Sequence, residues 1–241
     1  MDALIYTVMS GAERAMRAQQ VHANNLANLE TGGFRANLEL ASSKAVAGPG
    51  YAARHLSELQ ADAVSARQGV QRQTGRDLDV AVQGDGLFTL QYQGGEAYTR
   101  GGNFSLDANG ALLFGSHPVL GEGGAIVIPE HSSVQIAKDG TISVQAPGET
   151  ELQVVDKLKL VKPTMAGMTK NEAGLLVARD GAALAADASV SLNPGHLEGS
   201  NVSAVEEMVA TMSLNRDFEV QMKMMKAADG MAEAGNRLIR E

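Results

Sequence analysis

The chain opens on a long stretch with helical periodicity, IYTVMSGAERAMRAQQVHANNLANL at residues 5–29. Apolar or small residues recur there at alternating steps of three and four, namely Ile5, Val8, Ala12, Ala15 and Leu26. This spacing places them on one face of an amphipathic α-helix. Because the face consists largely of small side chains, it buries little area but permits close approach of another helix. An isolated helix of this kind is marginal in water, so we expect it to order when packed in an assembly.

The same rhythm returns near the other end, in SAVEEMVATMSLNRDFEVQMKMM at residues 203–225. The apolar seam predicted for this second helix is larger and rich in methionine: Val205, Met208, Met212, Phe218, Met222, Met225 and Ile239. Ser203 and Glu206 have the spacing of a capping box, which predicts that the helix begins there. Methionine side chains adapt to differently shaped neighbours. The two ends therefore indicate a subunit that assembles with others, and the spacing of these methionines favours a packing seam over a soft-metal site.

Between residues 77 and 199 the apolar period changes from the helical one to two. Leu78, Val80 and Val82 alternate with other residues, and turn pairs recur along the segment, at Gly84-Asp85-Gly86, Asn109-Gly110, Asp139-Gly140 and Asp180-Gly181. This pattern predicts an antiparallel all-β body, either a sandwich or a small barrel. We therefore expect an α+β chain with a helical part at 1–35 and 200–241, a linker or extended arm at 36–76 and a β body at 77–199.

Composition excludes several functional classes. The 241 residues carry a formal charge of −8 without a basic run, which argues against nucleic acid as a partner. Cysteine is absent, so disulfides and thiolate metal sites are excluded. No uninterrupted apolar stretch approaches the roughly 18 residues of a membrane span. Asp2 stands where a secretory signal would carry a basic residue, so we expect no cleavable signal peptide.

Residues that could carry chemistry are few and dispersed. The five histidines lie far apart, and the loop at residues 84–88 lacks the pattern of a phosphate-binding motif. Asp77 and Asp79 flank one apolar residue, so in a strand both carboxylates would share one face, as an acid–base pair, a cation site or a solvated surface. The solvated surface is the simplest interpretation. We predict no catalytic residue, no metal site and no cofactor.

Several segments resemble the bacterial flagellar rod and hook axial proteins. The first are ANNLAN at residues 23–28 and TGGFR at 31–35, and the others are DLDVAVQGDGLF at 77–88, YTRGGNFS at 98–105, LEGSNVSAVEEM at 197–208 and RDFE at 216–219. Asparagine lowers intrinsic helicity but offers amides that fix the register between packed helices. The N-terminal assembly surface that we predict therefore comprises Ile5, Val8, Ala12, Ala15, Asn24, Asn25, Leu26 and Asn28.

This resemblance implies a fold and a function. Both terminal helices would pair as a coiled coil in an inner tube, with the β body outside it. The chain would be a non-enzymatic subunit of the basal-body rod in the periplasm, exported unfolded by the flagellar type III apparatus, and would join proximal and distal rod subunits in a heteromeric helical shaft. The start of the chain and residues 218–225 favour a proximal rod subunit. The alternatives are a distal rod or hook-family subunit, a secreted assembly chaperone or cap, and a secreted enzyme that uses Asp77 and Asp79.

Overall fold

The computed structural model describes residues 2–45 and 55–240, with the side chains of residues 5–40, 42–45, 55–57 and 63–237. The chain divides into two compact units. The first, which we call the helical unit, comprises Met1–Ala27, Asn37–Ala63 and Val202–Glu241. The second, which we call the β body, comprises Asn28–Ala36 and Val64–Asn201. The chain therefore passes between the two units at four places.

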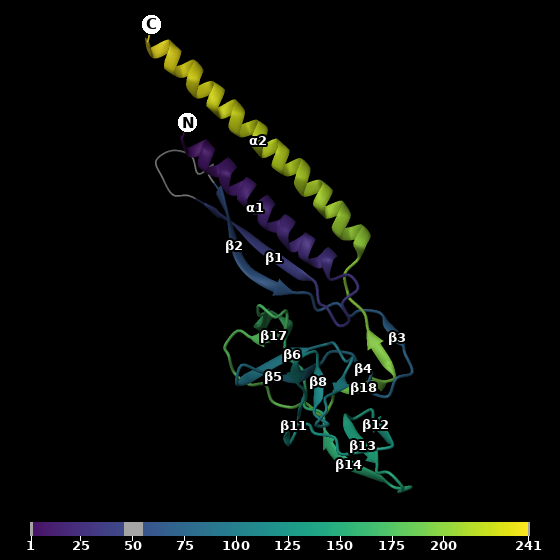
Figure 1. Cartoon of the computed structure of the whole chain (residues 1–241). Coiled ribbons are helices and arrows are strands. Elements are labelled where there is room, and N and C mark those ends of the chain that lie inside the picture. Colours follow the sequence, from purple (N-terminus) through teal and green to yellow (C-terminus); the bar gives the residue numbers. More distant parts are fainter. Residues whose placement is uncertain (1, 46–54, 241) are drawn as a thin grey trace. The chain divides into compact units, whose positions relative to one another are not determined.

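The helical unit is built on two antiparallel helices (Figure 1). Helix α1 spans Asp2–Ala27 and helix α2 spans Ala204–Arg240, which corresponds to about 39 and 55 Å of helix. Strands β1 (Asn37–Ala45) and β2 (His55–Val64) form a two-stranded sheet, and β1 packs against α1. Because α2 is the longer helix, its C-terminal part extends past the beginning of α1 (Figure 1).

The two helices meet along a seam with steps of three and four. On α1 the buried members are Val8, Ala15, Ala18 and Asn25. On α2 the buried or half-buried members are Glu207, Thr211, Leu214, Phe218, Gln221, Met225, Ala228 and Ala232. A Cβ atom added to Gly11 would lie 2.9 Å from the Gln221 amide, so this glycine permits close approach of the helices. At the start of α2, the Glu206 N–H donates to Ser203 Oγ at 3.4 Å, as the capping spacing predicts.

The structure arranges the predicted arm, residues 36–76, differently from our expectation. Its described part contains β1, β2 and β3 (Gln71–Gln73), and residues 37–63 belong to the helical unit. Small alanine and serine side chains, which suggested a linker, instead form strands alongside α1. Helix α1 also ends at Ala27, so residues 28–35 belong to the β body. Within this segment Gly33 has a φ of 70°, a left-handed conformation that glycine adopts without strain.

The β body consists of short antiparallel strands. Its largest sheet has the order β15-β5-β6-β17-β16, a second has the order β12-β13-β14 and a third β7-β8-β9, and β10-β11, β18-β4 and β19-β3 form pairs. The strand bounds are β4 Val80–Gln83, β5 Leu87–Tyr92, β6 Gly95–Thr99, β7 Ser105–Leu106, β8 Leu112–Phe114, β9 His117–Pro118, β10 Leu120–Gly121, β11 Gly124–Ala125, β12 Ser133–Ile136, β13 Thr141–Gln145, β14 Leu152–Lys157, β15 Leu160–Val161, β16 Met168–Lys170, β17 Leu176–Ala178, β18 Ser191–Pro194 and β19 His196–Glu198, with a 3₁₀ turn at Met165–Gly167. The prediction of terminal helices around a mostly β, antiparallel centre is confirmed.

One large apolar core joins most of these small sheets, and a second, smaller cluster includes Leu87, Val161 and Leu176. The large core contains Val80, Phe88, Leu112 and Ile142, all fully buried, and it extends from β4 through β8 to β13. Phe88 and Phe104 meet edge to face with their ring centroids 5.1 Å apart. Successive short strands each contribute one or a few inward-pointing residues to the large core. Packing of these side chains against one another therefore stabilises the β body, although its strands are short.

Candidate assembly surface and the buried clasp

A polar layer holds one end of the α1–α2 pair in register. Asn25 is 1% exposed, and its amide donates to Glu207 Oε1 at 3.3 Å and to the Asn37 carbonyl at 3.1 Å. Its Oδ1 accepts from the Asn37 N–H at 2.8 Å, and His22 Nδ1 lies 2.5 Å from Glu207 Oε2. One asparagine thus connects α1 with both α2 and β1. A buried amide with all of these partners favours this register over a shifted one.

The predicted N-terminal surface residues occupy different environments. Val8, Ala15 and Asn25 are buried, and Ile5, Ala12 and Leu26 are half-buried. Asn24 is exposed, and its Oδ1 accepts from the Asn37 amide at 3.1 Å. Asn28 lies beyond the end of α1, in a turn where its Oδ1 accepts from the Thr31 hydroxyl at 3.1 Å. Its placement in the helical seam is therefore corrected, because α1 ends one residue earlier.

The predicted C-terminal surface residues belong to two faces of α2. Phe218 and Met225 lie half-buried on the seam with α1. Val205, Met208, Met212 and Met222 are exposed. Ile239 lies in α2, and its side chain is outside the described part of the chain. The sequence pattern combined these two faces into one seam, because apolar residues are abundant on both.

The exposed apolar surface of α2 is extensive. It comprises Val205, Met208, Val209, Met212, Val220, Met222, Met224 and Met231. At about 100° per residue, Val205, Val209 and Val220 lie on the side opposite the seam with α1. The seam predicted from the sequence did not include Val209 or Val220, although Val209 lies four residues after Val205 and three before Met212, and Val220 lies two steps of four after Met212, which indicates a second stripe. A helix that is apolar on two sides packs against neighbours on both.

In the β body, three charged residues form a buried cluster that we call the clasp. Glu198, at the end of β19, is 2% exposed; it accepts a hydrogen bond from Arg100 and forms an ion pair with Arg35. Arg100 Nε and Nη2 lie 2.8 and 2.5 Å from Glu198 Oε2, and Arg35 Nη2 lies 3.3 Å from Oε1. Burial lowers the pKa of Arg35, and the Glu198 carboxylate opposes this shift. The remaining guanidinium hydrogens mostly donate to backbone carbonyls, including those of Gly84 and Gly86.

Glycines and an asparagine bring the backbones around the clasp into contact. A Cβ atom at Gly33 would lie 2.2 Å from the Gly101 nitrogen, and one at Gly69 would lie 2.1 Å from the Gly199 oxygen. Asn201 accepts from the Ala36 N–H at 2.7 Å and donates to the Arg67 carbonyl at 2.7 Å. The segments 31–36, 66–69 and 198–201 are therefore joined where the chain enters or leaves the β body.

The clasp gives a physical role to the segments that resemble the rod and hook proteins. Arg35 belongs to TGGFR, Arg100 to YTRGGNFS and Glu198 to LEGSNV. The sequence did not predict a role for these three residues, because it does not reveal which distant charges meet in the fold. The glycines beside each charge were the available signal, since close backbone approach requires glycine.

Two further groups of the β body, the half-buried Lys170 and the buried Tyr98, have shifted pKa values. Lys170 Nζ lies 3.6 Å from the centre of the Phe34 ring and 2.5 Å from the Arg35 carbonyl oxygen. Burial lowers the pKa of Lys170 from 10.5 to about 8. Burial also raises the pKa of Tyr98 from 10.0 to about 12, and its hydroxyl donates to Glu96 Oε2 at 2.9 Å. Both groups are therefore less readily charged in the fold than in the unfolded chain.

We expect the free energy of unfolding to rise between about pH 8 and 10 and to fall above pH 10. Between pH 8 and 10, Lys170 is mostly neutral in the folded protein but mostly protonated in the unfolded chain, so raising the pH increases the free energy of unfolding. Above pH 10, Tyr98 loses its proton in the unfolded chain but keeps it in the fold, so raising the pH lowers the free energy of unfolding. Each fully effective group changes the free energy by at most about 1.4 kcal/mol per pH unit. Urea unfolding followed by circular dichroism measures this profile. Lys170→Met should remove the rise, and an unchanged rise in that variant would refute the assignment.

The acidic pair considered for catalysis is not brought together. Asp77 is exposed, whereas Asp79 is buried and lies 3.6 Å from Arg76 Nη1. The expected common strand face is corrected, because β4 begins only at Val80. Among the described residues, no group of three or more histidine, aspartate or glutamate side chains could hold a metal ion. Within the same residues, neither helix combines the length and apolarity needed to cross a membrane.

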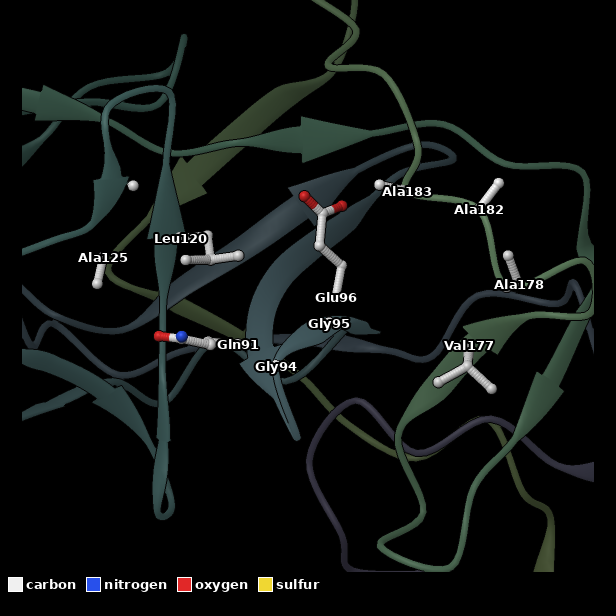
Figure 2. Close-up of a pocket in the computed structure, with 12 residues that line it drawn as sticks. Gln91, Gly94, Gly95, Glu96, Leu120, Ala125, Val177, Ala178, Ala182 and Ala183 are labelled. Atoms are coloured by element: carbon white, nitrogen blue, oxygen red, sulfur yellow. The ribbon is translucent and has the colours of Figure 1, made fainter.

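A groove of about 590 Å³ lies in the β body between the β5–β6 hairpin and the segment after β17 (Figure 2). Glycine and alanine supply most of its lining, and Glu96 is the one ionisable residue among the lining side chains. The Glu96 carboxylate already contacts Lys159 Nζ at 2.5 Å and accepts from Tyr98. The groove therefore offers shape and backbone groups to a ligand, and its one charge is already neutralised.

Comparison with known families places three parts of the chain. Residues 5–35 match the family described as "Flagella basal body rod protein". Residues 81–144 match "Flagellar hook protein FlgE/F/G D1 domain", and residues 193–238 match "Flagellar basal body rod FlgEFG protein C-terminal". These stretches include most of α1, much of the β body and most of α2. Together they define a protein of the flagellar rod and hook class.

Similarity to individual proteins identifies a family within this class. The flagellar basal-body rod protein FlgF of Salmonella typhimurium is 41% identical over 99% of both chains, and that of Escherichia coli is 39% identical over the same shares. The flagellar basal-body rod protein FlgG of Bacillus subtilis is 31% identical over 93% of this chain and 94% of its own. The chain belongs to the family of flagellar basal-body rod proteins FlgF, whose members are structural subunits of the rod.

Proposed function

We propose that this rod subunit contributes α1 and α2 to a coiled-coil inner tube of the proximal rod and holds its β body outside that tube. Other rod subunits, proximal and distal, are its partners in a heteromeric helical shaft. Export proceeds in the unfolded state through the flagellar type III apparatus, and the assembled rod stands in the periplasm. The chain acts as a structural part and not as an enzyme.

The observation that carries this proposal is the exposed apolar surface of α2. In the isolated chain α2 uses one side for α1, yet Val205 on the other side is 71% exposed and Val209 is 61% exposed. Water contact at so many large apolar side chains is unfavourable by roughly 25 cal/mol per Å² of apolar surface. Neighbouring helices would remove this surface from water. Contacts that do not close on themselves generate a helical array, as a shaft requires.

The register of the α1–α2 pair also supports the proposal. Burial of the Asn25 amide between α1, α2 and β1 holds the two helices in one relative position. The exposed apolar surface of α2 is thereby presented in a defined orientation to a neighbour. A tube with a constant helical repeat needs such a fixed presentation, since a variable register would give unequal contacts between subunits.

Substitution of Val209 and Val220 by glutamate is expected to abolish swimming of a strain that carries only the variant subunit. Glutamate is at least as compatible with a helix as valine, so the free subunit should remain folded. In the assembled tube, however, both charges would be buried without partners, at a cost of several kcal/mol. Motility in soft agar and electron microscopy of basal bodies measure assembly, and circular dichroism of the purified variant measures folding.

The matched control replaces two exposed valines of the β body, Val127 and Val154, by glutamate. This variant has the same change in charge and the same loss of apolar area, and the proposal expects it to swim. A motile Val209→Glu, Val220→Glu strain would refute the proposed role of α2. So would a control strain that fails to swim while the α2 variant succeeds.

A further inference from the structure

The exposed methionines of the described residues all lie on the two helices. Seven methionines are between 37 and 62% exposed: Met9, Met16, Met208, Met212, Met222, Met224 and Met231. In the β body, by contrast, Met168 is 1% exposed and Met165 is half-buried. Since the sequence contains no cysteine, methionine supplies every sulfur atom of the chain.

Five of these methionines form much of the exposed apolar surface of α2. Met208 and Met212 lie one turn apart near its beginning, and Met222, Met224 and Met231 lie further along. None of the five belongs to the seam with α1, which is occupied at the corresponding turns by Phe218 and Met225. Their thioether sulfur atoms are therefore accessible to small reagents before the subunit meets a neighbour.

We propose that these five methionines of α2 are a site of reversible oxidation that controls whether the subunit assembles. Hypochlorous acid is the oxidant class. The thioether sulfur attacks its oxygen, an S–O bond forms, and the O–Cl bond breaks with release of chloride and a proton. Sulfur loses two electrons and chlorine gains them, so the step balances without another reactant. The product is methionine sulfoxide.

Oxidation changes the character of the exposed surface without changing its shape much. A sulfoxide oxygen is a strong hydrogen-bond acceptor, and burying it against an apolar neighbour leaves it without a partner. Five sulfoxides on one helix therefore oppose association along its length. This inference rests on the proposed function, because it requires that the exposed apolar surface of α2 be the surface that assembles.

Reduction restores the surface. A methionine sulfoxide reductase supplied with a dithiol removes the oxygen as water, and the dithiol becomes a disulfide. Both sulfoxide epimers arise at an exposed sulfur, so two reductases of opposite stereospecificity are needed for full recovery. The subunit itself has no thiol that could be trapped by such a reductant.

The first test uses purified full-length protein and measured equivalents of hypochlorous acid, with peptide mass spectrometry as the readout. The five α2 methionines, Met208, Met212, Met222, Met224 and Met231, should be oxidised at least tenfold faster than Met168, which serves as the internal control. Treatment with both reductases and dithiothreitol should return them to methionine. Equal rates at the α2 residues and at Met168 would overturn the proposal, because the site would then have no selectivity.

The second test uses cells in which the subunit is synthesised during a sublethal pulse of hypochlorous acid. The matched variant replaces all five α2 methionines with leucine, which keeps the apolar surface and suits a helix but offers no sulfur. With the wild-type subunit, the number of completed basal bodies per cell should fall at least fivefold. With the leucine variant it should fall less than twofold. Equal losses in the two strains, or no loss in either, would overturn the proposal.

A third variant separates failure of this inference from failure of the proposed function. Replacing the same five methionines with glutamine makes the surface permanently polar, much as the sulfoxides would. If the glutamine variant assembles, the surface is not the assembly surface and the proposed function fails with the inference. If it does not assemble while the oxidised wild-type subunit does, the proposed function stands and the oxidation site is refuted.

Discussion

Replacement of Glu198 with alanine is expected to destabilise the β body by about 3–5 kcal/mol. Glu198 is the one carboxylate that contacts both Arg35 and Arg100 in the clasp, and the two arginines are 5 and 1% exposed. Without it, two guanidinium charges remain buried with only backbone carbonyls as partners. The Gly69 N–H also loses its acceptor, which lies 2.9 Å away. Guanidinium unfolding monitored by circular dichroism measures the loss.

Two controls test whether charge is the cause. Glu198→Gln keeps the length and one acceptor oxygen, so we expect a loss smaller than that of the alanine variant but still above about 1 kcal/mol. Glu122→Ala removes an exposed carboxylate that lies 3.5 Å from Lys157 Nζ, and should change the free energy by less than about 1 kcal/mol. If Glu198→Ala and Glu122→Ala cost the same, the clasp does not stabilise the β body.

Deletion of α2 from Val202 onward is expected to abolish rod assembly completely while the β body stays folded. The cut leaves Asn201 and the clasp intact, since every residue of the β body precedes it. It removes both the seam that covers α1 and the exposed apolar surface of the same helix. Swimming in soft agar should fall to that of a strain without the subunit.

Two measurements on the truncated chain make this result specific. Amide hydrogen exchange should show the same slow exchange for β5 and β13 as in the full-length protein, because these strands belong to the apolar core of the β body. Detection of the truncated chain outside the cytoplasm would separate loss of assembly from loss of export. A motile strain, or rapid exchange throughout the β body, would contradict the expected independence of the two units.

The fold was predictable to different extents in its different parts. Apolar residues at steps of three and four predicted both helices, and apolar residues at every second position with glycine turns predicted the antiparallel body. The spacing of apolar residues reveals the type of element because it shows which side of that element is buried. Strands β1 and β2 were not predicted, since their alanine and serine residues carry no strong pattern. The end of α1 was misplaced, because Asn28 suits a turn as well as a helical interface.

The candidate assembly surfaces were also predictable only in part. A resemblance to the rod and hook proteins could be read from short segments, and the relatives bear it out. The order of residues alone also shows that both ends are apolar enough to need partners. It could not show which apolar residues of α2 meet α1 and which stay exposed, because Phe218 and Met212 satisfy the same spacing. That choice depends on the rotation of one helix against the other.

Short segments of the sequence were enough to predict the helices, the antiparallel β body and the family, since propensity and periodicity act over a few residues. The clasp is a property of the folded chain. Arg35, Arg100 and Glu198 are separated by up to 163 positions, and only packing brings one carboxylate between two guanidiniums. In water such charges have little reason to pair, whereas burial removes their hydration and makes the contact necessary.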